Sequence, residues 1–165
     1  KATDNLELGF NMTYIDENEV NAPPVADDRF EGGFAPVGLD PTPQLPLFAD
    51  KSYSLYAEYS FDASRIGIGG DGYIRLQHSY TGESLNQIDD TPGIQPQETQ
   101  GDYRLTDVTL GFDLGSWQAT LFARNLTDER GVTFKDSSDF DRKFGRASYF
   151  IVPPRQIGVS MRRNF

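Results

Sequence analysis

The sequence of 165 residues contains no cysteine and a single histidine, His78. The absence of cysteine excludes disulfide bonds, thiolate metal ligands and a cysteine nucleophile. One histidine makes histidine-based catalysis or a zinc site hard to assemble. No trio of residues suggests nucleophilic catalysis either. We therefore expect a protein that is not an enzyme and that has no metal site and no cofactor.

Long apolar runs are also missing. The longest is four residues, Tyr149 to Val152, whereas a membrane-spanning helix needs about 20. No segment has apolar residues at helical spacing. The chain opens at Lys1 without a methionine or a basic and apolar leader, so we expect an internal or processed piece of a longer protein.

Positive charge is scarce and the acidic residues are unevenly distributed. Fifteen basic and 25 acidic residues give a net charge of -10, and this balance predicts no nucleic-acid partner. Residues 16–50 carry eight acids and one base (-7), and residues 82–102 carry five acids and no base (-5), so the remainder is +2. Both stretches are rich in proline and glycine, and residues 127–148 form a third polar stretch. All three are predicted as loops.

Between these loops, apolar and polar residues alternate with the period of a β-strand. Six segments alternate, each close to the ~9–11 residues of a tilted membrane strand. One side of each is aliphatic and aromatic, and the other carries residues such as Glu7, Glu58 and Arg75. The predicted strands are residues 5–14, 52–61, 72–81, 104–114, 117–126 and 155–165.

The connections alternate between long loops and short turns near residues 62–71 and 114–116. This alternation is typical of outer-membrane barrels, which have long extracellular loops and short periplasmic turns. We therefore predict an all-β fold, an antiparallel transmembrane β-barrel fragment of about six strands without a plug domain. Trp117, Phe61 and Tyr59 are predicted as interfacial aromatics.

Three segments resemble one family. Leu121 to Asp128 (LFARNLTD), Pro154 to Phe165 (PRQIGVSMRRNF) and Leu45 to Leu55 are similar to segments of TonB-dependent outer-membrane receptors. The resemblance implies the C-terminal part of a barrel of about 22 strands with a plug domain. It also implies a C-terminal assembly signal at Phe165, Met161, Val159 and Ile157, from which Arg163 departs.

The same resemblance implies a function and a set of partners. The function is active import of a scarce nutrient, a ferric siderophore or a similar iron complex, across the bacterial outer membrane. The partners are outer-membrane lipid and lipopolysaccharide, the remaining barrel strands and plug domain, the TonB complex through an N-terminal part missing here, the barrel assembly machinery and a small-molecule substrate.

Two other classes remain open. A passive porin or another barrel shares the alternation, and a soluble carbohydrate-binding β-sandwich also alternates apolar and polar residues.

Other motifs point to no ligand. Gly67, Gly69 and Gly72 fit a dinucleotide-binding pattern, but a strand follows them where a helix is required. Acid pairs such as Asp27/Asp28 and Asp89/Asp90 lack the spacing of a calcium loop. His78 is predicted as an interfacial side chain.

Overall fold

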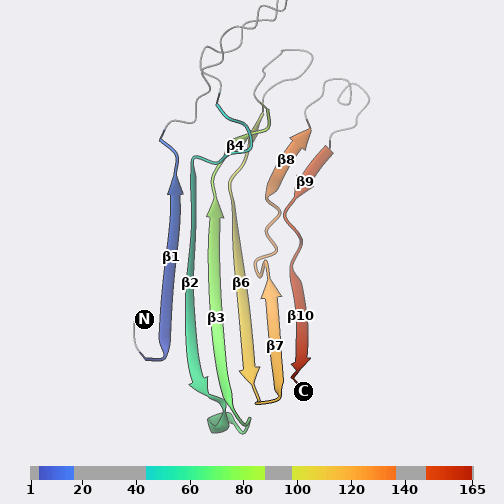
Figure 1. The fold of residues 1–165 in the computed structure, drawn as a ribbon. Helices are drawn as coiled ribbons and strands as arrows, with labels where there is room; N and C mark the ends of the chain where they lie inside the picture. The colour runs from blue at the N-terminus through green and yellow to red at the C-terminus, as the bar shows by residue number, and fades with distance from the viewer. Residues whose placement is uncertain (1–3, 17–43, 88–97, 137–147, 165) are drawn as a thin grey trace, which may run out of the picture.

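A computed structural model describes residues 4–16, 44–87, 98–136 and 148–164. Its main element is one antiparallel sheet of six strands in the order β1-β2-β3-β6-β7-β10 (Figure 1). The predicted all-β, antiparallel architecture is therefore confirmed. The strands are β1 (Leu6–Tyr14), β2 (Lys51–Asp62), β3 (Asp71–Thr81), β6 (Tyr103–Asp113), β7 (Trp117–Arg124) and β10 (Gln156–Arg163).

Each strand begins and ends within two residues of the segment that the alternation predicts. The largest differences are at the ends of β7 and β10. β7 stops at Arg124 because Asn125 has a positive φ of 48°, a conformation that no β-strand contains. Phe165, the last residue of the predicted closing strand, lies outside the described residues.

The predicted loops contain short strands that the sequence did not reveal. Residues 82–102 contain β4 (Ser84–Leu85) and β5 (Thr99–Gln100), which pair with each other. Residues 127–148 contain β8 (Val132–Asp136), which pairs with β9 (Ser148–Ile151). Predicting these stretches as wholly irregular was wrong, because strands of two to five residues are too short for a period-two pattern to stand out. Much of the remaining loop sequence, at 17–43, 88–97 and 137–147, lies outside the described residues.

The two short turns lie at one end of the sheet, opposite β4, β5, β8 and β9 (Figure 1). Between β2 and β3, a 3-10 helix (Ala63–Ile66) begins where the Asp62 carboxylate accepts from the Ser64 N–H at 2.9 Å, and it ends at Gly67 with a φ of 82°. Between β6 and β7, Gly115 has a φ of 80° and donates its N–H to Asp113 Oδ1 at 3.0 Å. Positive φ at both glycines is a conformation that other residues rarely adopt.

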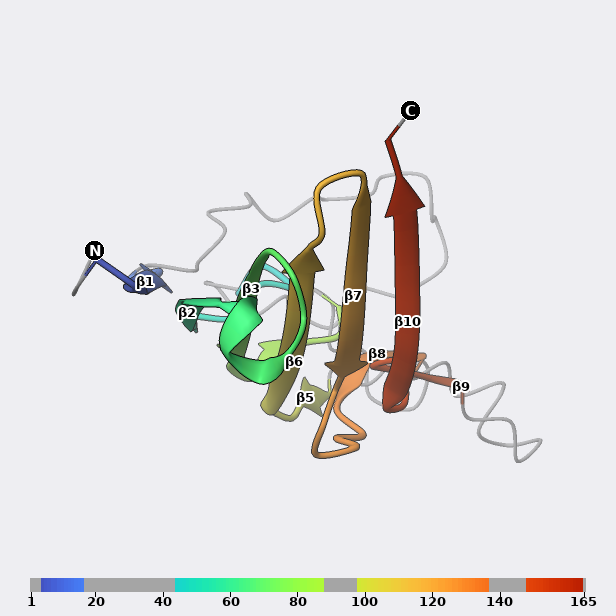
Figure 2. The same ribbon diagram turned by 90° about the horizontal axis from the view of Figure 1, so that it is seen from below.

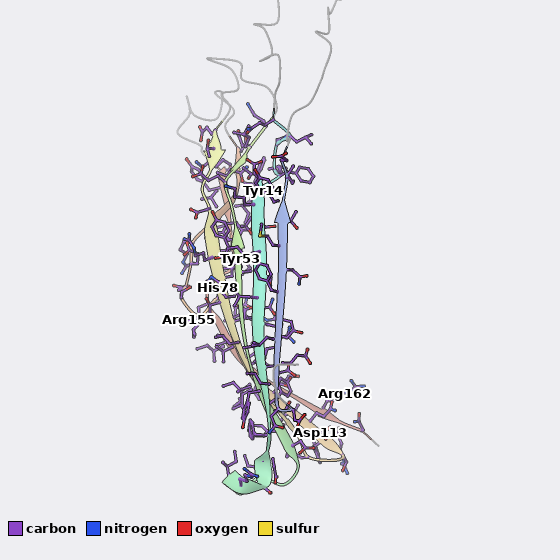
Figure 3. The ribbon with its side chains drawn as sticks, turned by 90° about the vertical axis from the view of Figure 1, so that its left-hand side faces the viewer. Tyr14, Tyr53, His78, Asp113, Arg155 and Arg162 are labelled. Carbon is purple, nitrogen blue, oxygen red and sulfur yellow. The ribbon has the colours of Figure 1, made fainter. Side chains whose placement is uncertain are left out.

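The six strands of the main sheet lie side by side in a single layer (Figures 2 and 3). Among the described residues, the only buried apolar ones are Ala63 and Val152. β1 and β10 are the two edges, so the sheet is not closed into a barrel. Within the described ranges, no helix is long and apolar enough to cross a membrane.

Candidate functional site

The strand register separates the side chains into two faces. Residues that pair across an antiparallel ladder point to the same side of the sheet. One such row is Tyr59, Ile74, Leu110, Leu121 and Val159, and we call its side the apolar face. The next row along, Glu58, Arg75, Thr109, Phe122 and Gly158, belongs to the opposite side, the polar face.

The middle of the apolar face is mainly aliphatic and is open. Leu121 in the central part of the sheet is 49% exposed, and Ile157 on the edge strand β10 is 78% exposed. The exposed apolar side chains of this face also include Leu8, Phe10, Leu55, Ile74, Leu76 and Val159. We expect another molecule or a second layer to cover this continuous apolar surface, since soluble monomers rarely expose patches larger than a few hundred Å².

An aromatic group lies on this face at the short-turn end, and we call it the lower band. It contains Tyr59, Phe61, Phe112 and Trp117. The ring of Phe61 is 6.4 Å from that of Tyr59 and 6.3 Å from that of Phe112, measured between centroids. The Arg163 guanidinium is 5.3 Å from the Trp117 ring. The predicted interfacial residues Trp117, Phe61 and Tyr59 therefore share one face and one end of the sheet.

A second aromatic group lies on the same face at the other end, and the sequence analysis missed it. This upper band consists of Tyr14, Tyr53 and Tyr80. Tyr53 and Tyr80 stack at 5.2 Å, Lys51 is 5.8 Å from the Tyr14 ring, and Arg104 is 5.0 Å from the Tyr80 ring. Figure 3 shows Tyr14 and Tyr53 toward the end opposite Asp113 and Arg162. The signal was present in the sequence as a tyrosine near the loop end of three alternating segments.

The distance between the two bands follows from strand geometry. Tyr53 and Phe61 are eight residues apart on β2, which corresponds to ~26 Å at about 3.3 Å per residue. In a barrel whose strands are tilted by ~40°, this spacing would be about 20 Å along the barrel axis, compared with the ~25 Å apolar band of outer-membrane barrels. His78 lies below the upper band, with its Nδ1 2.9 Å from Thr106 Oγ1 and its ring 6.2 Å from that of Tyr53.

The polar face is packed by aromatic rings lying over glycines. Tyr56 pairs with Gly9, Tyr73 with Gly111, and Phe122 with Gly158. At each of these glycines, an added Cβ would collide with the ring opposite it. An aromatic ring covering a cross-strand glycine shields its backbone and fixes the register. Tyr56 and Phe122 break the apolar–polar alternation for this reason.

Some charged groups on the polar face are paired with neighbouring side chains. The Tyr56 hydroxyl donates to Glu7 Oε1 at 2.6 Å, and the Arg75 guanidinium lies 4.0 Å from the Tyr56 ring. Arg75 also forms an ion pair with Glu58 at 3.4 Å. Together these contacts connect β1, β2 and β3 on the side of the sheet that would face water in a barrel.

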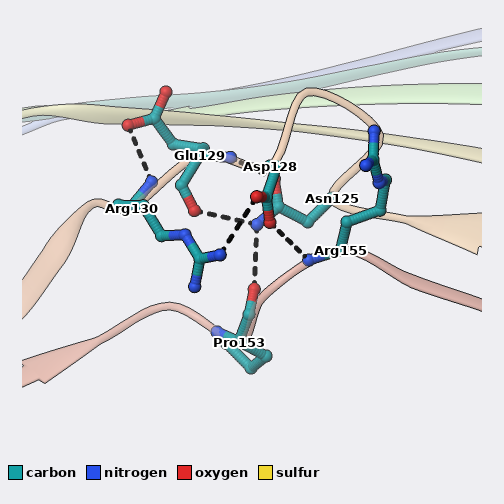
Figure 4. A network of polar contacts seen from close by, with 6 residues as sticks. All are labelled: Asn125, Asp128, Glu129, Arg130, Pro153 and Arg155. Atoms are coloured by element: carbon teal, nitrogen blue, oxygen red, sulfur yellow. Dashed lines mark hydrogen bonds and ion pairs between the residues drawn. The ribbon is translucent and has the colours of Figure 1, made fainter.

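At the end of β7, Asn125 is the centre of a network that we call the clamp (Figure 4). Asn125 is 5% exposed. Its Nδ2 donates to the carbonyl oxygens of Glu129 at 2.9 Å and Pro153 at 2.8 Å, and its Oδ1 accepts from the Glu129 N–H at 2.8 Å. Its own N–H donates to Asp107 Oδ1 at 2.8 Å. One side chain and its backbone thus connect β6, β7 and the chain entering β10.

Asp128 completes the clamp. It has a φ of 56°, and its carboxylate accepts from the Arg155 N–H at 2.9 Å and from the Arg130 guanidinium at 3.0 Å. These contacts, chiefly the Arg155 N–H, hold the pKa of Asp128 below its usual value. The resemblance-bearing segment Leu121 to Asp128 therefore has a structural role. It ends β7, and asparagine and aspartate tolerate the positive φ that this change of direction requires.

The residues of the expected assembly signal lie on the edge strand. Ile157, Val159 and Met161 are exposed on the apolar face of β10, and their cross-strand partners are Ala123, Leu121 and Ala119. Phe165 lies outside the described residues. Ile157, Val159 and Met161 therefore lie on the strand that ends the sheet among the described residues, and a further strand could be added next to it.

No protein-family model and no curated protein matches the chain.

Proposed function

We propose that this chain forms six neighbouring strands of a transmembrane β-barrel in a bacterial outer membrane. The observation that carries the proposal is the apolar face, a continuous exposed surface bounded at both ends by aromatic bands. Lipid acyl chains can cover such a surface without making specific contacts, and tyrosine and tryptophan favour the two membrane interfaces. The polar face, with its charged side chains, then lines the inside of the barrel.

The edges of the sheet support the same proposal. Open sheet edges do not occur within the hydrocarbon region, because unpaired backbone groups cannot find water there. β1 and β10 therefore pair with further strands of the same barrel, and the polar face meets a plug domain or water. The short turns face the periplasm and the long loops face the outside, as in other outer-membrane barrels.

The transport activity is a second step of the proposal, and it is based on the resemblance of Leu121 to Asp128 and Pro154 to Phe165. It makes the barrel an active, TonB-dependent importer of a small molecule, a ferric siderophore or a similar iron complex. Two alternatives compete with it. A passive porin would share the membrane placement, and a soluble β-sandwich would cover the apolar face with a second protein layer.

Spin labels on β7 test the membrane placement. Single cysteines at Ala119, Leu121 and Ala123 are compared with cysteines at Gln118 and Thr120, in the folded protein reconstituted in lipid bilayers. The odd positions should be accessible to oxygen, which concentrates in lipid, and the even positions to a water-soluble nickel chelate. A β-sandwich predicts low accessibility to both reagents at the odd positions, and that result would reject the proposal.

Uptake measurements test the transport step separately. Cells carrying the gene should accumulate a ferric siderophore only while the inner-membrane proton gradient and the energy-coupling complex are intact. Uptake that continues after either is removed would favour the porin. Accessibility and uptake report on different steps, so a failure of one leaves the other interpretable.

A further inference from the structure

Two hairpins extend past the long-loop end of the sheet, β4–β5 and β8–β9 (Figure 1). They belong to separate two-stranded sheets, and neither is hydrogen-bonded into the main sheet as a strand. β5 nevertheless lies against β8. Side chains, and not a continuous ladder, therefore join the two hairpins.

Lys135 on β8 makes the first connection. Its Nζ donates to the carbonyl oxygen of Thr99 on β5 at 2.8 Å, and it is 3.9 Å from Glu98 Oε2. The side chains of Lys135 and Glu98 are each only about a quarter exposed, at 24% and 25%. A charged donor that is partly withdrawn from water makes a stronger hydrogen bond than a neutral one.

Asn86, directly after β4, makes the second connection. It is 5% exposed. Its Nδ2 donates to the Lys135 carbonyl oxygen at 3.4 Å, and its Oδ1 accepts from the Glu98 N–H at 2.7 Å. Its own N–H donates to the Glu98 carbonyl oxygen at 3.1 Å. The same few groups thus hold β4 to β5 and both of them to β8.

Both hairpins are also fixed to their surroundings. The Leu47 N–H donates to the Leu85 carbonyl oxygen at 2.7 Å, which ties β4 to the segment before β2. The Val152 N–H donates to the Gly131 carbonyl oxygen at 2.9 Å at the base of β8–β9, beside the clamp. On β8–β9, the rings of Phe134 and Phe150 pack at 5.8 Å.

We propose that β4–β5 and β8–β9 form one cooperative unit, which we call the outer brace. Its two hairpins open together because the Lys135 side chain connects them. Contacts made by one hairpin, with a ligand or another molecule, then change the opening equilibrium of the other. This coupling does not depend on whether the apolar face contacts lipid, so it stands apart from the proposed function.

Hydrogen exchange of the folded protein tests the brace. Lys135→Met keeps the aliphatic stem and removes the charge and the donor. Backbone amides of β4–β5 and of the adjoining Asn86 should exchange about three- to tenfold faster in this variant, as expected when local opening loses one charge-assisted hydrogen bond. Lys51→Met, which removes a cation from the upper band, is the matched control and should leave β4–β5 unchanged.

Two further variants sharpen the result. Lys135→Arg keeps a cationic donor and should return exchange in β4–β5 to within about twofold of the wild type. Glu98→Gln removes the ion pair with Lys135 and should have a smaller effect than Lys135→Met, because the bond from Lys135 to Thr99 remains. If Lys135→Met accelerates exchange in β8–β9 alone, or in neither hairpin, each hairpin opens independently and the outer brace does not exist.

Discussion

The two faces of the sheet differ in how many specific side-chain contacts they make. On the middle of the apolar face, side chains such as Leu121 and Ile157 are exposed and are held by little beyond the strand itself. On the polar face, rings cover glycines, and Arg75, Tyr56 and Glu7 form a connected set across three strands. In the proposed membrane placement, the apolar face needs only to be apolar, because fluid acyl chains accept any such surface. The specific contacts that select one register are concentrated on the polar face and at the strand ends.

The largest expected effect of this difference comes from placing a charge on either face of β7. Leu121→Arg puts a guanidinium near the middle of the apolar face, where it costs about 2–4 kcal/mol in a barrel. Thr120→Arg puts the same group on the polar face, one residue away, and should cost less than about 1 kcal/mol. The measurement is the free energy of unfolding in lipid vesicles by urea titration. Equal costs for the two variants would mean that both faces meet the same environment.

The alternation of the sequence was sufficient to predict the six strands and the division into two faces. Side-chain period fixes which residues share a face, and a one-residue slip would reverse all of them. What it could not predict are the short hairpins and the clamp. Asn125 has four polar contacts to groups as distant along the chain as Asp107 and Pro153, and no local pattern encodes such partners. The upper band was not predicted for a different reason. In the sequence, each of its tyrosines is one apolar position of an alternating segment, and nothing local shows that the three lie together.

The second prediction tests the contribution of the clamp to stability. Asn125→Ala removes the two donors and one acceptor of the amide and leaves the carbonyl oxygens of Glu129 and Pro153 and the Glu129 N–H without this partner. Each lost hydrogen bond costs about 0.5–1.5 kcal/mol, and alanine tolerates the φ of 48° less well than asparagine. We expect a loss of roughly 2–4 kcal/mol in the same urea titration.

Asn11→Ala is the control for the clamp variant, because Asn11 is an exposed asparagine within β1. It should change the free energy of unfolding by less than about 0.5 kcal/mol. Asn125→Gly provides a second comparison, since glycine accepts a positive φ without strain and separates the lost hydrogen bonds from the backbone cost. Should Asn125→Ala behave like the control, the clamp would contribute nothing to stability.

A smaller effect is expected from the glycines of the polar face. Gly111→Ala adds a methyl group that collides with the Tyr73 ring, and the ring must move away from the strand. Overpacking of this kind costs about 1–3 kcal/mol. Gly101→Ala is the control, because an added Cβ there meets nothing within 4 Å. The pair is compared by thermal unfolding monitored by circular dichroism.

A second substitution in the Gly111→Ala background shows whether the ring causes the loss. Tyr73→Ala removes the ring, so the double variant Gly111→Ala/Tyr73→Ala should be less destabilised than the sum of the two single variants. Additive losses would argue against a direct contact between the two positions. Such a result would also remove the main physical reason for calling the polar face the more specifically packed of the two.

The smallest effect concerns the charge on Asp128 at the clamp, and it appears only as a dependence on pH. The pKa of Asp128 is lowered in the folded protein by the Arg155 N–H and the Arg130 guanidinium, so folding favours the ionised carboxylate. Its stabilising contribution is therefore fully present above the unfolded pKa of about 3.9, and it is lost as the pH falls through the folded pKa.

Asp128→Asn keeps an oxygen that can accept from Arg155 but removes the charge. The unfolding midpoint of Asp128→Asn should lie below that of the wild type at pH 6, and the two midpoints should converge as the pH falls below the folded pKa. Arg130→Met should reduce the difference without abolishing it, because the Arg155 N–H remains. A difference between wild type and Asp128→Asn that stays constant from pH 6 to pH 2 would show that the carboxylate acts at the clamp through its shape and not through its charge.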